Sequence, residues 1–115
     1  MIRPAVAGLL LLAAAPQGST GEHAEWFRSL HQPTTGMSCC SVADCRPVRA
    51  AIQQHQDGTA YYAWVDTRTF GPDAPNDWVR IPEDKILRQR DNPMGEAVLC
   101  WARGIIFCFV RGSEV

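Results

Sequence analysis

The pattern of apolar and polar positions divides the chain into a short helical part and a strand-rich remainder. A helix is predicted over residues 22–31, after a capping-box pattern at residues 19–22. Trp26, Phe27 and Leu30 share one face of this helix, and a proline two residues beyond its end stops it. We expect this apolar face to dock on the core of the domain.

Further along, the pattern changes to a period of two, which is typical of strands. Residues 46–54 and 59–66 are predicted to form a hairpin, with Asp57-Gly58 as its turn signal and a loop from Gln54 to Asp57. The apolar residues expected on the buried face of the first strand are Val48, Ala50 and Ile52.

A second hairpin is predicted near the C-terminus, over residues 96–102 and 105–110. Its last strand is apolar at nearly every position, which indicates burial on both faces and a central place in the sheet. A short strand at 78–81 and a short helix opening at Pro82 come before it. The predicted fold class is α+β, with the N-terminal helix packed on a small antiparallel sheet of about five strands. We expect disulfides to stabilise this sheet, and a partial barrel is one arrangement that it can take.

Residues 1–20 have the features of a secretory signal peptide. Arg3 precedes an apolar run from Ala5 to Ala15, and small residues follow it. About 11 apolar residues are too few to span a bilayer as a helix, which needs about 20. An uncleaved anchor or a buried helix is the alternative, but the run is not amphipathic. We therefore expect a periplasmic or secreted protein, with residues 21–115 as a single domain that has no membrane contact after cleavage.

The five cysteines are the strongest chemical signal in the sequence, and all of them follow the predicted signal peptide. They are Cys39, Cys40, Cys45, Cys100 and Cys108. In an oxidising compartment we expect four of the five to form two disulfides. Cys100 and Cys108 either bridge each other or reach back separately to the early cluster. The second arrangement is favoured, because bonds that close long loops remove more entropy from the unfolded chain.

Metal binding and thiol-redox chemistry are the two alternatives for the cysteines. Three clustered thiols near His31 would suit a soft ion such as copper or zinc, but the spacing of paired zinc ligands is missing. No Cys-x-x-Cys pair, nucleophile elbow or phosphate loop occurs either. We predict no catalytic residue, no metal ligand and no cofactor. The formal charge of −1 also gives no basic footprint for nucleic acid.

The loop over residues 66–77 is the most promising place for recognition. Long ordered loops often carry function on small scaffolds. The candidate binding residues are Phe70, Asp73, Asp77 and Trp78. A simpler alternative is that Phe70 only pins the loop to the core. We expect the other tryptophans, at 26, 64 and 101, to be core residues.

The motif Cys-Cys-x4-Cys-Arg-Pro-Val, together with other segments, resembles a group of small exported bacterial proteins. The matching segments are Trp26, Pro33 to Gly36, Cys39 to Val48, Val79 to Pro82, and Cys100 to Cys108. The resemblance implies export and a cysteine framework, with a Cys-bearing C-terminal hairpin. It implies no activity.

Together these observations predict a non-enzymatic periplasmic or secreted module that binds a protein or envelope component. The alternatives are a thiol-based metal-binding protein and a thiol-redox protein. The sequence specifies neither the partner nor the oligomeric state.

Overall fold

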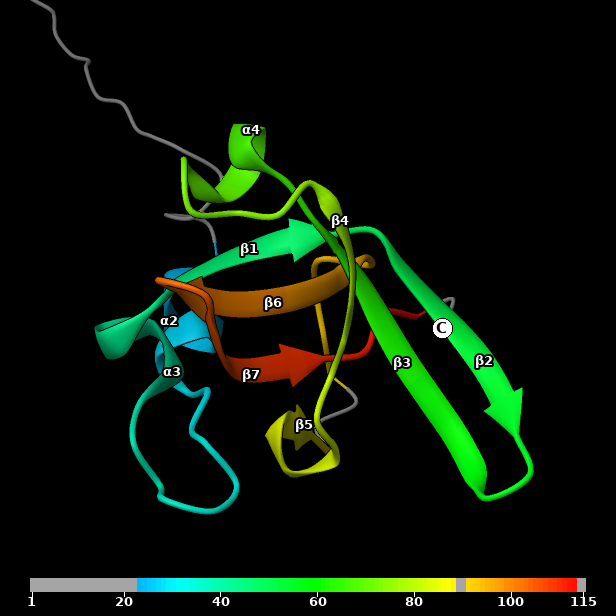
Figure 1. Ribbon diagram of the computed structural model, residues 1–115. Helices are drawn as coiled ribbons and strands as arrows, with labels where there is room; N and C mark the ends of the chain where they lie inside the picture. The colour runs from blue at the N-terminus through cyan, green and yellow to red at the C-terminus, as the bar shows by residue number, and fades with distance from the viewer. Residues whose placement is uncertain (1–22, 89–90, 114–115) are drawn as a thin grey trace, which may run out of the picture.

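The computed structural model describes residues 23–88 and 91–113, which form short helices and two β-sheets (Figure 1). The elements are α2 (Ala24–Arg28), α3 (Cys39–Val42), β1 (Asp44–Val48), β2 (Ala50–His55), β3 (Gly58–Val65), α4 (Thr67–Phe70), β4 (Asp77–Arg80), the 3-10 helix η2 (Glu83–Lys85), β5 (Ile86–Leu87), β6 (Ala97–Ala102) and β7 (Ile105–Val110). The chain is thus a small, sheet-rich α+β protein. The predicted signal peptide and capping box lie outside the described residues.

One sheet has four strands in the order β1-β6-β7-β5. β6 pairs antiparallel with both β1 and β7, whereas the two-residue β5 pairs parallel with β7. β6 and β7 are apolar on both faces because both faces of the sheet are covered. The predicted central place of the last strand is therefore confirmed. The expectation of a wholly antiparallel sheet is wrong at β5. The chain leaves η2 at the edge of the sheet and then runs in the same direction as β7.

The other sheet has three antiparallel strands in the order β2-β3-β4. His55 pairs with Gly58, so the turn between β2 and β3 is shorter than the predicted loop. Gly58 has a φ of 132°, which favours glycine at this position. The predicted hairpin is thus present, with a tighter turn.

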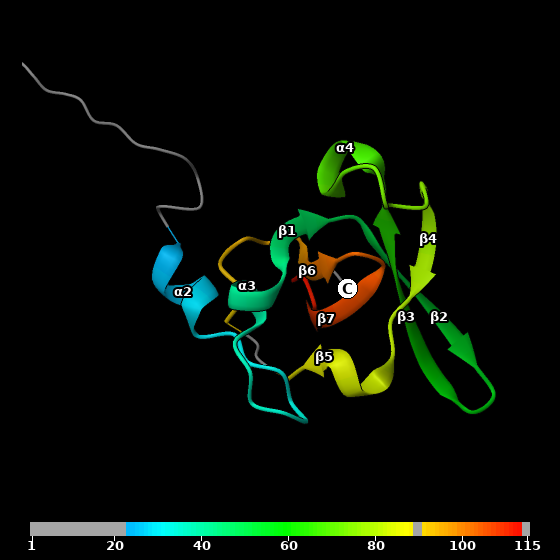
Figure 2. The same ribbon diagram turned by 60° about the vertical axis from the view of Figure 1, so that its left-hand side comes forward.

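The two sheets and the helices α2 and α3 form three layers, which Figure 2 shows side by side. The main core lies between the two sheets. Its buried residues are Val48, Ala63, Val65, Ala74, Ile81, Ala97, Leu99, Trp101, Ile106 and Phe109. A second core lies between the four-stranded sheet and helices α2 and α3. Its buried residues are Phe27, Leu30, Cys39, Leu87, Val98, Cys100, Cys108 and Val110.

The prediction of one strand over residues 46–54 is wrong, because the chain changes sheets at Arg49. β1 ends at Val48 in the four-stranded sheet, and β2 begins at Ala50 in the three-stranded sheet. Both residues contact the core between the sheets, so the alternation continues across the break. Ile52 is 39% exposed because it lies further along the β2-β3 hairpin, which extends beyond this core (Figure 1).

The N-terminal helix is shorter than predicted. α2 covers only Ala24–Arg28, and the chain then turns so that the backbone N–H of Cys39 donates to the carbonyl of Leu30. This turn buries Leu30 beside the disulfides, which a continued helix would prevent. The sheet of about five strands is also corrected to seven strands in two sheets, and they form no closed barrel in the described part of the chain. Among the described residues, no helix is long and apolar enough to cross a membrane.

Candidate functional site

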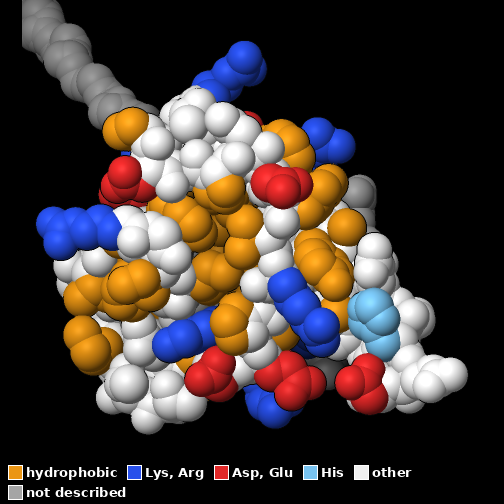
Figure 3. All heavy atoms as spheres, in the orientation of Figure 1, with side chains coloured by type: hydrophobic (Ala, Val, Ile, Leu, Met, Phe, Trp, Pro, Cys, Tyr) orange, Lys and Arg blue, Asp and Glu red, His pale blue; other side chains and the backbone are white. Residues whose placement is uncertain are grey.

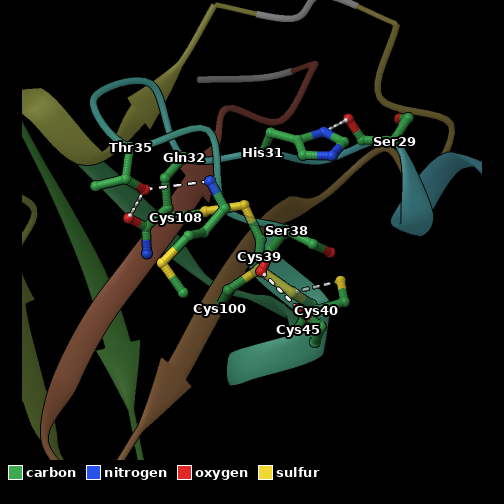
Figure 4. Close-up of a disulfide and its surroundings, with 12 residues drawn as sticks. Ser29, His31, Gln32, Thr35, Ser38, Cys39, Cys40, Cys45, Cys100 and Cys108 are labelled. Atoms are coloured by element: carbon green, nitrogen blue, oxygen red, sulfur yellow. Dashed lines mark hydrogen bonds between the residues drawn. A yellow bond between two sulfur atoms is a disulfide. The ribbon is translucent and has the colours of Figure 1, made fainter.

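The cysteines join the N-terminal layer to the C-terminal hairpin. Cys39 bonds to Cys108 and Cys45 bonds to Cys100, which is the second of the two arrangements considered above. Cys40 is the free cysteine. Figure 4 shows the five cysteines gathered in one place, where α3 and the start of β1 meet β6 and β7. Burial raises the pKa of the Cys40 thiol to about 11.

The sulfur atoms are close enough to be candidate metal ligands, but four of them are in disulfides. The sulfur atoms of Cys40, Cys45 and Cys100 lie within 4.8 Å of one another. Only the free thiol retains a proton to exchange for a metal ion while both bonds are intact. His31 lies outside this group, and its Nδ1 is 2.9 Å from the carbonyl oxygen of Ser29 (Figure 4). The described geometry therefore gives the metal alternative no complete donor set in the oxidised protein.

Of the four candidate binding residues, Asp77 and Trp78 are in contact at the start of β4, where the backbone N–H of Trp78 donates to Oδ1 of Asp77 at 2.7 Å. Residues 67–70 form helix α4, whose Phe70 ring packs toward the buried Trp101 with centroids 6.1 Å apart. Phe70 thus pins the loop to the main core, as the simpler alternative proposed. Asp73 and Asp77 are exposed on either side of the buried Ala74. Trp78 is 39% exposed and lies in β4, where the short strand at 78–81 was predicted.

Trp78 belongs to a row of large side chains across the outer face of the three-stranded sheet. Trp64 pairs with Trp78 in the β3-β4 register, and the backbone N–H of Trp64 donates to the carbonyl of Arg49. The tryptophan rings meet edge to face with centroids 5.6 Å apart. The guanidinium carbon of Arg49 lies 5.7 Å from the centroid of the Trp78 ring. These three residues form a cation–aromatic row on the side facing away from the main core.

A second row lies beside the first on the same face. Tyr62 pairs with Ala51 in β2 and with Arg80 in β4. Successive strand residues point to opposite faces, so Tyr62 and Trp64 point outward while Ala63 between them is in the core. We call these two rows the outer face, which consists of Arg49, Ala51, Tyr62, Trp64, Trp78 and Arg80. The prediction of Trp64 as a core residue is wrong, because it is half-buried on this face.

Hydrogen bonds hold the outer face in position at its edge. The Trp64 indole N–H donates to Oδ2 of Asp66 at 2.9 Å, and the backbone N–H of Thr69 donates to Oδ1 at 2.9 Å. The bond from Thr69 lowers the pKa of the Asp66 carboxyl below its usual value, and Trp64 and Arg68 act in the same direction. One carboxylate therefore both caps α4 and fixes the orientation of the Trp64 ring.

One side of the molecule combines apolar and basic groups on its surface. On the side of the molecule drawn in Figure 3, hydrophobic side chains gather over β1 and β6 and again beside β4, with basic side chains next to both groups. A pocket of ≈ 220 Å³ adjoins the outer face at Arg80 and is also lined by Ala60, Pro82 and Glu83. This pocket has one acidic and one basic side chain and is also lined by Tyr61, Ile81 and Ile86, which belong to or pack against the main core.

No protein-family model, curated protein or solved structure matches this chain. The candidate site therefore depends on the geometry alone. Of the residues of the outer face, Trp78 was predicted as a binding candidate, whereas Arg49, Tyr62 and Arg80 were not. The signal that could have found them is the alternation of the large rings Tyr62 and Trp64 with Ala63 and Val65, whose smaller side chains fit the narrow space between two sheets.

Proposed function

We propose that this protein is a non-enzymatic periplasmic or secreted binding module that uses the outer face to hold an acidic segment of a protein partner. The observation that supports the proposal most is the row formed by Arg49, Trp64 and Trp78, with Trp78 39% exposed. The two disulfides fit an oxidising compartment outside the cytoplasm.

The chemistry of the outer face suits protein recognition. Tryptophan, tyrosine and arginine are the residues that most often dominate binding energy at protein interfaces. Here the Asp66 carboxylate already holds the Trp64 ring in place, and the Trp78 ring packs edge to face against it. A partner therefore loses little binding energy to ordering of these side chains.

The charge of the outer face indicates the nature of the partner. Arg49, directly before β2, and Arg80, in β4, both belong to this face, one at each edge of the sheet. Two carboxylates that contact the face are already occupied: Asp66 accepts from Trp64 and Thr69, and Asp77 accepts from the backbone N–H of Trp78. An acidic segment with an apolar or aromatic side chain would pair with the arginines and cover the exposed Trp78 ring.

Alanine variants test the assignment. The wild-type protein and its Trp78→Ala and Arg49→Ala variants are immobilised and exposed to an envelope extract of the source organism. We expect a protein that is retained by the wild type, released by raised salt, and lost from both variants. Ile105→Ala is the matched control, because Ile105 is 54% exposed and lies in β7. If the Trp78→Ala variant retained the partner as well as the wild type does, the outer face would not be the binding site.

A further inference from the structure

The free thiol lies against one of the two disulfides. Cys40 is in α3, and its S–H donates to the Sγ of Cys45 at 2.7 Å. Cys45 is bonded to Cys100, and these two residues are also directly opposite each other in the pairing of β1 with β6. Three sulfur atoms from three elements thus occupy one site, with the thiol beside the sulfur that it could attack (Figure 4).

We propose that Cys40, Cys45 and Cys100 form a thiol–disulfide exchange site, in which Cys45 alternates between Cys100 and Cys40 as its bonding partner. Thiol–disulfide exchange requires a thiolate positioned at a disulfide sulfur. The contact between Cys40 and Cys45 supplies this position within one folded chain. Such intramolecular placement raises the effective concentration of the nucleophile far above that of a thiol in solution.

The step balances without an external oxidant or reductant. The Cys40 thiol gives its proton to water, and the resulting thiolate attacks the Sγ of Cys45. A Cys40–Cys45 bond forms, the Cys45–Cys100 bond breaks, and its electron pair remains on the sulfur of Cys100. Cys100 then takes up a proton, so each isomer contains one thiol and two disulfides. Cys39–Cys108 takes no part in the step.

Water has access to the thiol through a pocket of ≈ 500 Å³. Cys40 and Cys45 both line this pocket, together with Arg28 and Arg46. The pocket gives the proton of Cys40 a way out to solvent. Cys100 is fully buried, so the second isomer would hide its thiol in the core next to the helices. The exchange therefore moves the free thiol from a pocket on the surface to the interior.

The pKa of Cys40 sets the pace of the exchange. Because burial raises this pKa to about 11, the thiolate is scarce at neutral pH. As long as the pH is below this pKa, each increase of one pH unit raises the thiolate fraction about tenfold. The exchange rate should rise in the same proportion. No other described ionisable side chain lines the pocket besides Arg28, Arg46 and Asp44.

Mapping of the disulfides in the folded wild-type protein tests the proposal. The protein is kept without oxygen at pH 7, 8 and 9, trapped with acid at intervals, unfolded, alkylated at low pH, and mapped by mass spectrometry. We expect label on both Cys40 and Cys100, a Cys40–Cys45 peptide link, an intact Cys39–Cys108 link, and about tenfold faster approach to equilibrium per pH unit. Label on Cys40 alone at every pH and time would overturn the proposal. Labels spread over all five cysteines would also overturn it, since they would show general scrambling.

Two variants provide an independent check on the same site. Cys100→Ala leaves Cys45 without its partner, and we expect it to contain a Cys40–Cys45 bond and no free thiol. Two free thiols in this variant would contradict the proposal. Cys40→Ser is the matched control, and we expect it to retain only the Cys45–Cys100 and Cys39–Cys108 links at every pH.

Discussion

The bond between Cys39 and Cys108 should contribute a large share of the stability of this domain. The perturbation is the pair Cys39→Ala and Cys108→Ala, made in a Cys40→Ser parent so that no free thiol can form new bonds. The Cys45–Cys100 bond remains in both proteins. The difference between parent and variant then reports the removal of one disulfide.

The magnitude follows from the nesting of the two bonds. Cys39–Cys108 spans 69 residues and encloses Cys45–Cys100, which spans 55. Since the inner bond already joins the chain, the outer bond closes only the remaining ring of 14 residues, the difference of the two spans. Chain entropy gives about 3 kcal/mol for a ring of this size, compared with about 4 kcal/mol for an independent loop of 69 residues. Both sulfur atoms are fully buried, so lost packing adds to this value.

Urea denaturation of the parent and the variant measures the free energy of unfolding. We expect a loss of at least about 3 kcal/mol, which for a domain of this size lowers the Tm by about 12 °C or more. A loss below about 1 kcal/mol would refute the reasoning. It would mean that the unfolded chain is already restricted in this region, or that the bond does not join the two layers as the structure shows.

Three further predictions follow from the fold and the outer face. Trp64→Ala should cost about 1–2 kcal/mol in urea denaturation, because the ring is half-buried, and a cost above about 3 kcal/mol would place it in the core. Gly112→Ala should cost about 1–3 kcal/mol, because its Cβ would lie 2.6 Å from the backbone nitrogen of Ala97, and unchanged stability would contradict this packing. Asp66→Asn should melt at a lower temperature than the wild type at pH 7. The lowered pKa of Asp66 means that the advantage of the wild type is present above the unfolded-state pKa of about 3.9 and lost as the pH falls through the folded-state value. A difference in Tm that does not change between pH 7 and pH 2 would contradict the role of the carboxylate.

The sequence predicted the local pairs well because their signals are local. The β6-β7 hairpin follows from two apolar runs around Gly104, whose φ of 80° suits a turn. The β2-β3 hairpin follows from its alternation and from Asp57-Gly58. In both cases the residues that form the contact are near one another in the chain, so pattern and turn chemistry are sufficient.

The division into two sheets could not be predicted in this way. Val48 and Ala50 both contact the core between the sheets, so the alternation gives no sign that the chain leaves one sheet at Arg49 and enters the other. The same limit explains the error at Trp64. β3 is apolar on both faces, and the sequence favours the larger ring for the core. The rings of Trp101 and Phe109 already fill the space between the sheets, so β3 contributes Ala63 and Val65 there.

The candidate site was predicted only in part for the same reason. Trp78 was recognised because it follows a conspicuous loop. Its neighbours Arg49 and Trp64 come from other strands, and only the register of the three-stranded sheet brings them together. The expected disulfide framework was easier to predict, because cysteines carry their chemistry wherever they lie in the chain.

Site-specific photocrosslinking tests the proposed binding role of the outer face most directly. A photoreactive phenylalanine analogue replaces Trp78 on the outer face or, as a control, the exposed Ile105 or Met37. Each full-length protein is expressed in the source organism and irradiated in intact cells. We predict one discrete adduct with a protein partner from position 78, weakened by the additional change Arg49→Ala, and no such adduct from positions 105 and 37. An adduct from position 105 or 37 and none from position 78 would contradict the assignment of the outer face.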